Sequence, residues 1–194
     1  MLMRPARGFS LVELVVAMAI FGMLLALAAP NFSGWVRNMK IRTTAESIQT
    51  GLHVARSEAL RRNAAVRFQL TNTMDDTCAL STTGPHWFIS LDNVTDNCDV
   101  APSESDAQRI IQFRNGAEGG GRITSLTAGQ SLFTFNGLGR LVTTPSNILV
   151  SSTETGQTCI AAGGKVRCLS IVVTAGGQIR MCDPALPSND SQAC

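Results

Sequence analysis

The sequence predicts an α+β protein in which one long N-terminal helix packs on an antiparallel β-sheet domain. Two observations carry this prediction. Up to residue 62 the apolar residues form a continuous tract and then a stripe with helical spacing, whereas after Asn63 they alternate with a period of two. Glycine-containing turns separate the short alternating segments that follow. A helix followed by antiparallel strands places the helix on one face of a sheet.

The N-terminal segment joins a polar leader to an apolar tract. Residues 1–8 contain Arg4 and Arg7, and no side chain between 14 and 29 is charged or strongly polar. Together with 9–12, the tract approaches the roughly 20 residues that span a bilayer. A secretory signal has its cleavage site after the apolar core. A cut after Gly8 would instead remove 1–8 and leave the apolar helix, 9–30, on the mature chain.

Glu13 stands at the start of this tract. A carboxylate in a membrane helix costs about 2.5–3.5 kcal/mol on insertion scales, so such a residue usually marks a function. An ordinary signal anchor is the alternative interpretation of the segment, but an anchor has no need of Glu13. A buried charge needs a partner, and the sequence therefore predicts one for this carboxylate.

The helix is expected to continue beyond the tract as an amphipathic half, 31–63. Pro30 predicts a kink, because proline removes one amide hydrogen bond and clashes with the preceding turn. Beyond it, apolar residues recur at steps of three and four, which predicts one core-facing stripe that packs on the sheet. The stripe consists of Ile41, Ala45, Ile48, Leu52, Ala55 and Ala59.

Residues 64–194 are expected to form one β-rich globular domain. Val66, Phe68 and Leu70 alternate with polar residues, which predicts a half-buried strand. One hairpin is expected at Asn136 to Gly139 and another at 175–177. The further candidate strands are 87–91, 108–113, 122–126, 132–135, 140–143, 168–174 and 178–182.

Six cysteines all lie beyond the apolar tract. An even count in an exported domain indicates disulfides, and six cysteines allow 15 pairings. Their spacing favours the local pairs Cys78–Cys98, Cys159–Cys168 and Cys182–Cys194. A metal site is the weaker interpretation, because no two cysteines have CxxC spacing and the two histidines, His53 and His86, are far apart in the sequence.

Charge and composition narrow the classes of function. The chain has 16 basic and 14 acidic side chains, and loss of Arg4 and Arg7 with the leader would leave it near neutral, so bulk charge gives no argument for nucleic acid. The segment 75–106 holds seven acidic residues and no basic one, which predicts a solvated loop braced by Cys78–Cys98. No acid–base, nucleophile or phosphate-loop constellation is visible. We therefore expect neither an enzyme nor a cofactor.

The junction reads Gly8-Phe9-Ser10-Leu11-Val12-Glu13, the pattern G-F-[ST]-L-x-E. It resembles the class III signal of type IV pilins and type II secretion pseudopilins. The resemblance implies that a prepilin peptidase cuts after Gly8, that Phe9 is N-methylated, and that Glu13 pairs with the N-terminal amine of a neighbouring subunit. The family also has a proline at the place of Pro30. It further implies a single-pass inner-membrane protein with a periplasmic C-terminal domain, which then enters a pilus or pseudopilus.

Two segments, 47–63 and 176–184, resemble the GspH/FimT/FimU branch of minor pseudopilins. This implies a minor type IV pilin that assembles with major and minor pilins and the inner-membrane assembly machinery, and that primes or caps the pilus. Several cysteines are more typical of the pilus members than of the secretion-system member. A tip pseudopilin of a type II secretion system is one alternative.

A DNA-binding minor pilin for natural transformation is the other alternative. FimT-like members carry a basic G-R-x-R motif, whereas here the stretch is Gly177-Gln178-Ile179-Arg180. Arg180 alone gives one phosphate contact, and useful affinity at physiological salt needs several. Arg167, expected on the neighbouring strand, is the candidate for a second contact. We therefore rank DNA binding below a role in assembly.

Overall fold

The structure is a computed structural model that describes the chain except for residues 1–9, 104, 107, 117–123 and 155–156, and the side chains of 26–31. The chain divides into two compact units, Met1–Val36 and Arg37–Cys194. One helix, α1 (Leu11–Arg62), runs through the end of the first unit and the start of the second. Its backbone is helical at Pro30, whose side chain is not described, so the kink there stays a prediction.

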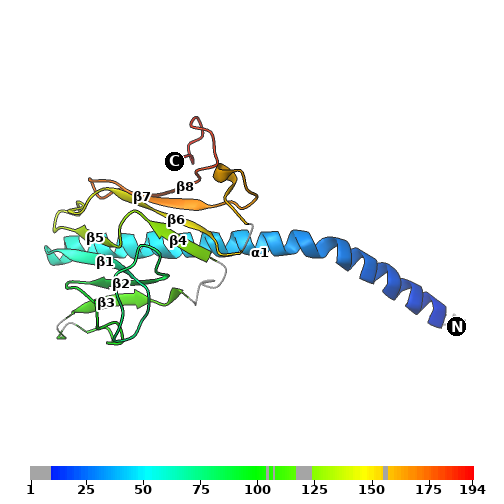
Figure 1. Cartoon of the computed structure of the whole chain (residues 1–194), viewed down its shortest axis with the longest axis horizontal. Coiled ribbons are helices and arrows are strands. Elements are labelled where there is room, and N and C mark those ends of the chain that lie inside the picture. Colours follow the sequence, from blue (N-terminus) through cyan, green and yellow to red (C-terminus); the bar gives the residue numbers. More distant parts are fainter. Residues whose placement is uncertain (1–9, 104, 107, 117–123, 155–156) are drawn as a thin grey trace, which may run out of the picture. The chain divides into compact units, whose positions relative to one another are not determined.

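The second unit contains two four-stranded antiparallel sheets. The first has the order β3-β2-β1-β5, and the second has the order β4-β6-β7-β8 (Figure 1). The strands of the first sheet are β1 (Val66–Thr71), β2 (His86–Ser90), β3 (Ile110–Arg114) and β5 (Leu132–Phe135). Those of the second are β4 (Thr124–Ala128), β6 (Ser146–Ser152), β7 (Leu169–Val173) and β8 (Ile179–Cys182). A short 3-10 helix, η2 (Ile160–Ala162), precedes β7. The predicted α+β class, a long helix with antiparallel strands, is confirmed.

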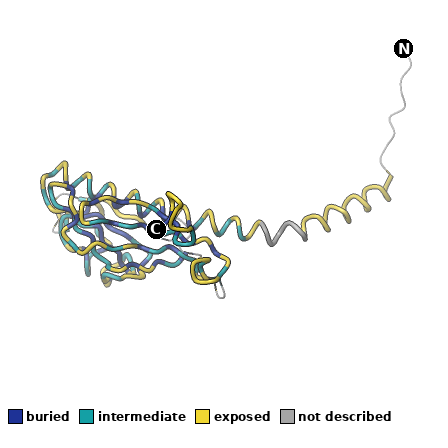
Figure 2. The backbone as a smooth tube through the Cα atoms, turned by 90° about the horizontal axis from the view of Figure 1, so that it is seen from above, coloured by how far each residue is buried: buried dark blue, intermediate teal, exposed yellow. Residues whose placement is uncertain are grey.

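The main core joins the second half of α1 to both sheets. All six residues of the predicted stripe are at most 1% exposed. They share one apolar cluster with Phe68 and Phe133 of the first sheet and with Ile148 and Ile171 of the second. The ring of Phe68 lies 5.6 Å from that of Trp87 and 6.3 Å from that of Phe133. Figure 2 shows the buried stretches concentrated in this unit, while residues 10–25 of α1 are exposed.

A second, smaller core lies in the segment that was expected to be a solvated loop. Cys78, Phe88, Val94, Cys98 and Ile110 are all buried in it. The described carboxylates of this segment are exposed, apart from the partly buried Asp92. The expectation of a solvated loop was therefore wrong for its apolar residues but not for these acidic ones. The segment therefore covers part of the first sheet as well as carrying negative charge.

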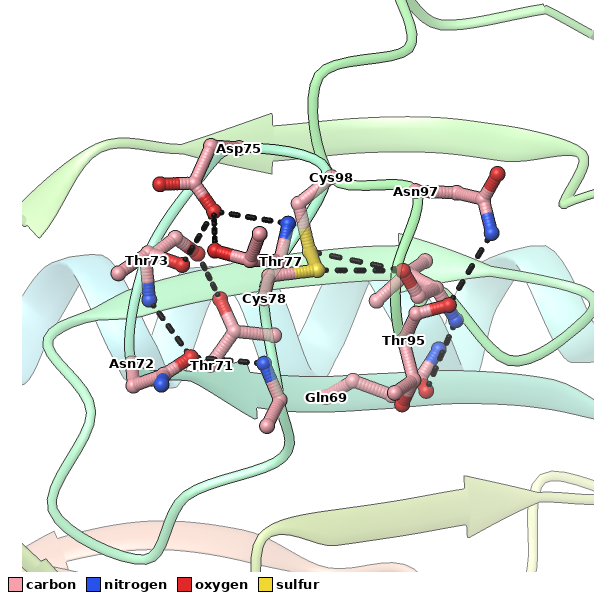
Figure 3. Close-up of a disulfide and its surroundings, with 12 residues drawn as sticks. Gln69, Thr71, Asn72, Thr73, Asp75, Thr77, Cys78, Thr95, Asn97 and Cys98 are labelled. Carbon is pink, nitrogen blue, oxygen red and sulfur yellow. Dashed lines mark hydrogen bonds between the residues drawn. A yellow bond between two sulfur atoms is a disulfide. The ribbon is translucent and has the colours of Figure 1, made fainter.

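The same segment explains why β1 is not half-buried as predicted. Gln69 is fully buried, because its Nε2 donates to Ser90 Oγ at 2.7 Å and to the carbonyl oxygen of Asp92 at 2.9 Å. Nearby, Asp75 Oδ1 accepts hydrogen bonds from the Thr77 and Thr73 hydroxyls, and these bonds lower the pKa of Asp75 (Figure 3). The alternation of apolar and polar residues in β1 does not reveal that the polar side chain of Gln69 is buried with hydrogen-bond partners of its own.

One predicted strand was wrong and one strand was missed. The missed strand is β6, whose apolar run is only three residues long between asparagine and serine, although β6 lies between β4 and β7. Residues 140–143 form no strand but an extended segment along the edge of β5. There the amide of Val142 donates to the carbonyl of Thr134 at 2.8 Å, and Leu141 bridges to Phe135.

Candidate functional site

The first turn of α1 holds Glu13 in a reciprocal cap. The backbone N–H of Ser10 donates to Glu13 Oε2 at 3.1 Å, and the backbone N–H of Val12 donates to Ser10 Oγ at 3.3 Å. This is a variant of the capping box in which the Ser10 hydroxyl accepts from the second helical amide, and it satisfies two amides that otherwise have no partner within the helix. The S-x-x-E spacing that produces it is readable in the sequence, and it gives Glu13 a second role besides its charge.

The surface beside Glu13 is apolar and exposed. Every large apolar side chain from Leu11 to Leu25 is between 50% and 80% exposed, and Glu13 is the sole charged residue between 10 and 36. Within the described part of the chain, no helix has both the length and the hydropathy needed to cross a membrane. The predicted processing residues, Gly8 and Phe9, lie outside the described residues.

The cysteines are joined as three disulfides. The bonds link Cys78 to Cys98, Cys159 to Cys168, and Cys182 to Cys194, over sequence separations of 20, 9 and 12. These are the local pairs favoured by the spacing. Among the described residues, no group of His, Cys, Asp or Glu is arranged to hold a metal ion.

The two arginines proposed as DNA contacts are both engaged within the chain. Arg167 Nε donates to Asp183 Oδ2 at 2.6 Å, and that carboxylate is buried. Arg180 donates to the carbonyl oxygens of Ala193 and Cys194, at 3.2 and 3.3 Å. Both contacts hold the segment after β8. Arg167 precedes β7 and does not lie in it, and the residue of β7 opposite Arg180 is Val172.

Arg56 of the first segment that carries the branch resemblance and Gly177 of the second both lie against the turn at Gly139. Arg56 Nε donates to the carbonyl oxygen of Gly139 at 3.0 Å, and the amide of Leu141 donates to the carbonyl of Ala175 at 3.2 Å. Gly139 and Gly177 both have positive φ angles, 71° and 76°. A Cβ at Gly177 would overlap the Gly139 carbonyl oxygen. The helix and the two glycine turns therefore form one joint, which only the tertiary structure reveals.

Two sequence profiles match the chain. The family described as type II transport protein GspH matches residues 44–177, and the prokaryotic N-terminal methylation motif matches residues 3–29. The first match covers the second half of α1 and most of the β-rich domain. The second covers the apolar tract and Glu13.

Individual proteins resemble the chain over a shorter stretch or at lower sequence identity. The pilin-like protein PilA1 of Thermus thermophilus is 41% identical over 64 residues, which are 33% of this chain and 40% of that protein. The chain thus spans less than half the length of this curated relative. The minor pilin FimU of Pseudomonas aeruginosa is 20% identical, with a TM-score of 0.49 over 79% of this chain and 94% of FimU. Escherichia coli GspH is 14% identical, with a TM-score of 0.46 over the same shares of the two chains.

Proposed function

Because the chain belongs to the family of the type II transport protein GspH and carries the N-terminal methylation motif, we propose that it is a minor type IV pilin that primes or caps the pilus. Membership itself makes it a minor pilin or pseudopilin, of a type IV pilus or of a type II secretion system. It also implies assembly with other pilins and processing by a prepilin peptidase. The assignment to the pilus and to its initiation or tip is the proposal.

The exposed apolar start of α1 is the observation that supports assembly through this helix, which the pilus and the secretion-system alternatives share. Each large apolar side chain left in water forgoes about 1.5–3 kcal/mol, and eleven of them lie between Leu11 and Leu25. Because these side chains are 50–80% exposed and not fully exposed, the total is of the same order as, or above, the roughly 5–15 kcal/mol by which a folded domain is stable. The surface must therefore be covered by lipid or by other helices, and a subunit that moves from membrane to filament has first one cover and then the other.

Processing follows from the same segment. We propose that residues 1–8 are removed, that Phe9 becomes the methylated N-terminus, and that 9–30 anchors the subunit in the inner membrane. The globular domain, 64–194, would then lie in the periplasm before assembly. Three disulfides suit that oxidising compartment, because reducing compartments rarely maintain them.

The contacts that Arg167 and Arg180 make within their own chain favour a role in assembly over a role in DNA uptake. Arg167 Nε lies 2.6 Å from Asp183 Oδ2 in an ion pair. Arg180 donates hydrogen bonds to the carbonyl oxygens of Ala193 and Cys194 in its own chain. Phosphate binding at either residue would have to displace these contacts. Two cations so engaged give little of the multiple-contact affinity that nucleic acid requires.

Deletion of the gene tests the proposal if three phenotypes are scored in one strain. We expect surface filaments to fall sharply while protein secretion stays normal, and a plasmid copy of the gene should restore the filaments. Lost secretion with normal filaments would instead assign the subunit to a secretion pseudopilus. Lost transformation with normal filaments would favour the DNA receptor.

A further inference from the structure

Arg37 continues the core-facing stripe of α1 with a charged residue. It lies four residues before Ile41, the first residue of the stripe, and so falls on the same helix face. Its side chain is only 16% exposed. It is also the first residue of the second compact unit. The apolar contact between helix and sheets thus ends at Ile41, and a polar contact extends it by one further turn toward the N-terminus.

The partners of Arg37 come from the segment between β6 and η2. Arg37 NH2 lies 2.6 Å from Glu154 Oε2, and Arg37 NH1 donates to Gln157 Oε1 at 3.1 Å. Gln157 is itself held in place, because its amide donates to the carbonyl of Glu154, and Cys159 two residues further on is bonded to Cys168. One guanidinium therefore contacts two side chains, those of Glu154 and Gln157.

Stability alone does not explain an arginine at this place. Removing the Arg37 guanidinium from water is costly, whereas its partner Glu154 stays 43% exposed, and an ion pair that is partly open to solvent contributes little to stability. Among the described residues, Arg37 Nε is in addition buried without a hydrogen-bond partner. An ionic contact differs from an apolar one in its dependence on salt, because added salt weakens it. It can also open without exposing apolar surface to water.

We propose that Arg37, Glu154 and Gln157 form a polar latch that opens independently of the apolar core. When the latch is closed, the helical turn at 37–40 is held by the loop. When it is open, that turn is free for contacts with other subunits, while Ile41 and the rest of the stripe stay packed. The use of the free turn in a filament rests on the proposed function, but the latch is a property of the single subunit.

Hydrogen exchange of the full-length mature protein in detergent micelles tests the latch. The two conditions are low and high salt, about 50 mM and about 1 M, where the Debye length shortens to about 3 Å. We expect a peptide covering 37–42 to exchange about tenfold faster at high salt, equivalent to about 1.4 kcal/mol, while a peptide covering 48–59 stays unchanged. Equal protection of the two peptides, with no salt response in either, would overturn the proposal.

Three variants separate the latch from general destabilisation. Glu154→Gln should speed exchange of 37–42 at low salt and abolish the salt response. Glu46→Gln is the matched control, because Glu46 pairs with Arg42 at 2.8 Å on the same helix but both side chains are largely exposed; an effect beyond about twofold is not expected of such a pair. Arg37→Met keeps the unbranched stem and should also lose the salt response.

Filament incorporation of Glu154→Gln is a separate measurement. A changed exchange pattern with unchanged incorporation would retain the latch and remove its role in assembly. An unchanged exchange pattern would reject the latch whatever the filament does. Failure of the proposed function and failure of this inference therefore give different results.

Discussion

Replacement of Gly177 by alanine should destabilise the globular domain more than the same replacement at the other two described glycines with positive φ, Gly139 and Gly163. Gly177 has a φ of 76°, which costs an L-residue about 1–2 kcal/mol. The new Cβ would also overlap the carbonyl oxygen of Gly139 and lie 3.3 Å from Arg56 Nε. Overpacking of this kind costs typically 1–3 kcal/mol. The two costs together give a loss of about 2–5 kcal/mol.

Two other glycines separate the two contributions. Gly163 has a φ of 80°, but nothing lies within 4 Å of a Cβ built there, so Gly163→Ala measures backbone strain alone. Gly176 has no such φ, and its Cβ would meet only Thr174 Oγ1 at 3.9 Å. We expect Gly163→Ala to cost about 1–2 kcal/mol, and Gly176→Ala to stay within about 0.5 kcal/mol of the parent protein.

Urea unfolding followed by circular dichroism gives the three values. The protein should be oxidised and in detergent, and the slope of the free energy of unfolding against urea should be the same in all variants. The order expected is Gly177 above Gly163 above Gly176. Equal losses for Gly177→Ala and Gly163→Ala would show that the joint at Gly139 and Arg56 tolerates an added methyl, and the packing argument would be wrong.

The remaining predictions concern processing, pH and DNA. Intact mass of the mature protein should begin at Phe9 with one added methyl group; a chain that still carries residue 1 would contradict the pilin interpretation. Burial lowers the pKa of His86, although a hydrogen bond with Asn115 opposes the shift, and the amide of Gly116 donates to His86 Nδ1 at 3.3 Å. The folded state therefore favours the neutral imidazole, so its contribution to stability should be complete above the unfolded pKa of 6.5 and lost as the pH falls below it; His86→Asn should remove this slope in urea unfolding at several pH values. In a gel-shift titration at two salt concentrations, Arg180→Ala should change already weak DNA binding little, and tight binding lost in that variant would reverse our ranking.

The helix was predictable because its signal is local. The stripe from Ile41 to Ala59 repeats with the helical period, and each of its residues is buried. The strand 132–135 was predicted with the bounds that β5 has, since its apolar alternation lies between glycine turns. By contrast, β6 is buried by its neighbours and not marked by its own composition. Its three apolar residues are too few for a period to be recognised.

The contacts of the candidate site were predictable only in part, because only some of them join residues that are close in the sequence. Glu13 stands out because one carboxylate in an apolar tract needs an explanation, and its cap to Ser10 follows from a spacing of three residues. The contacts of Arg37 and Arg56 join residues 117 and 83 positions apart. Neither side chain differs in sequence from the other arginines of the helix. Their partners are fixed by how the loops return to α1, which no local pattern encodes.

Filament incorporation of two Glu13 variants tests the central claim, which is that the subunit assembles through the start of α1. Glu13→Gln keeps an oxygen that can accept the Ser10 amide and removes the charge, whereas Glu13→Ala removes both. Each variant should insert into the membrane at least as well as the parent, because the carboxylate costs about 2.5–3.5 kcal/mol there. The ratio of subunit in sheared filaments to subunit in the membrane is the measurement. We predict that it falls sharply for both variants, and normal incorporation of both would contradict the account.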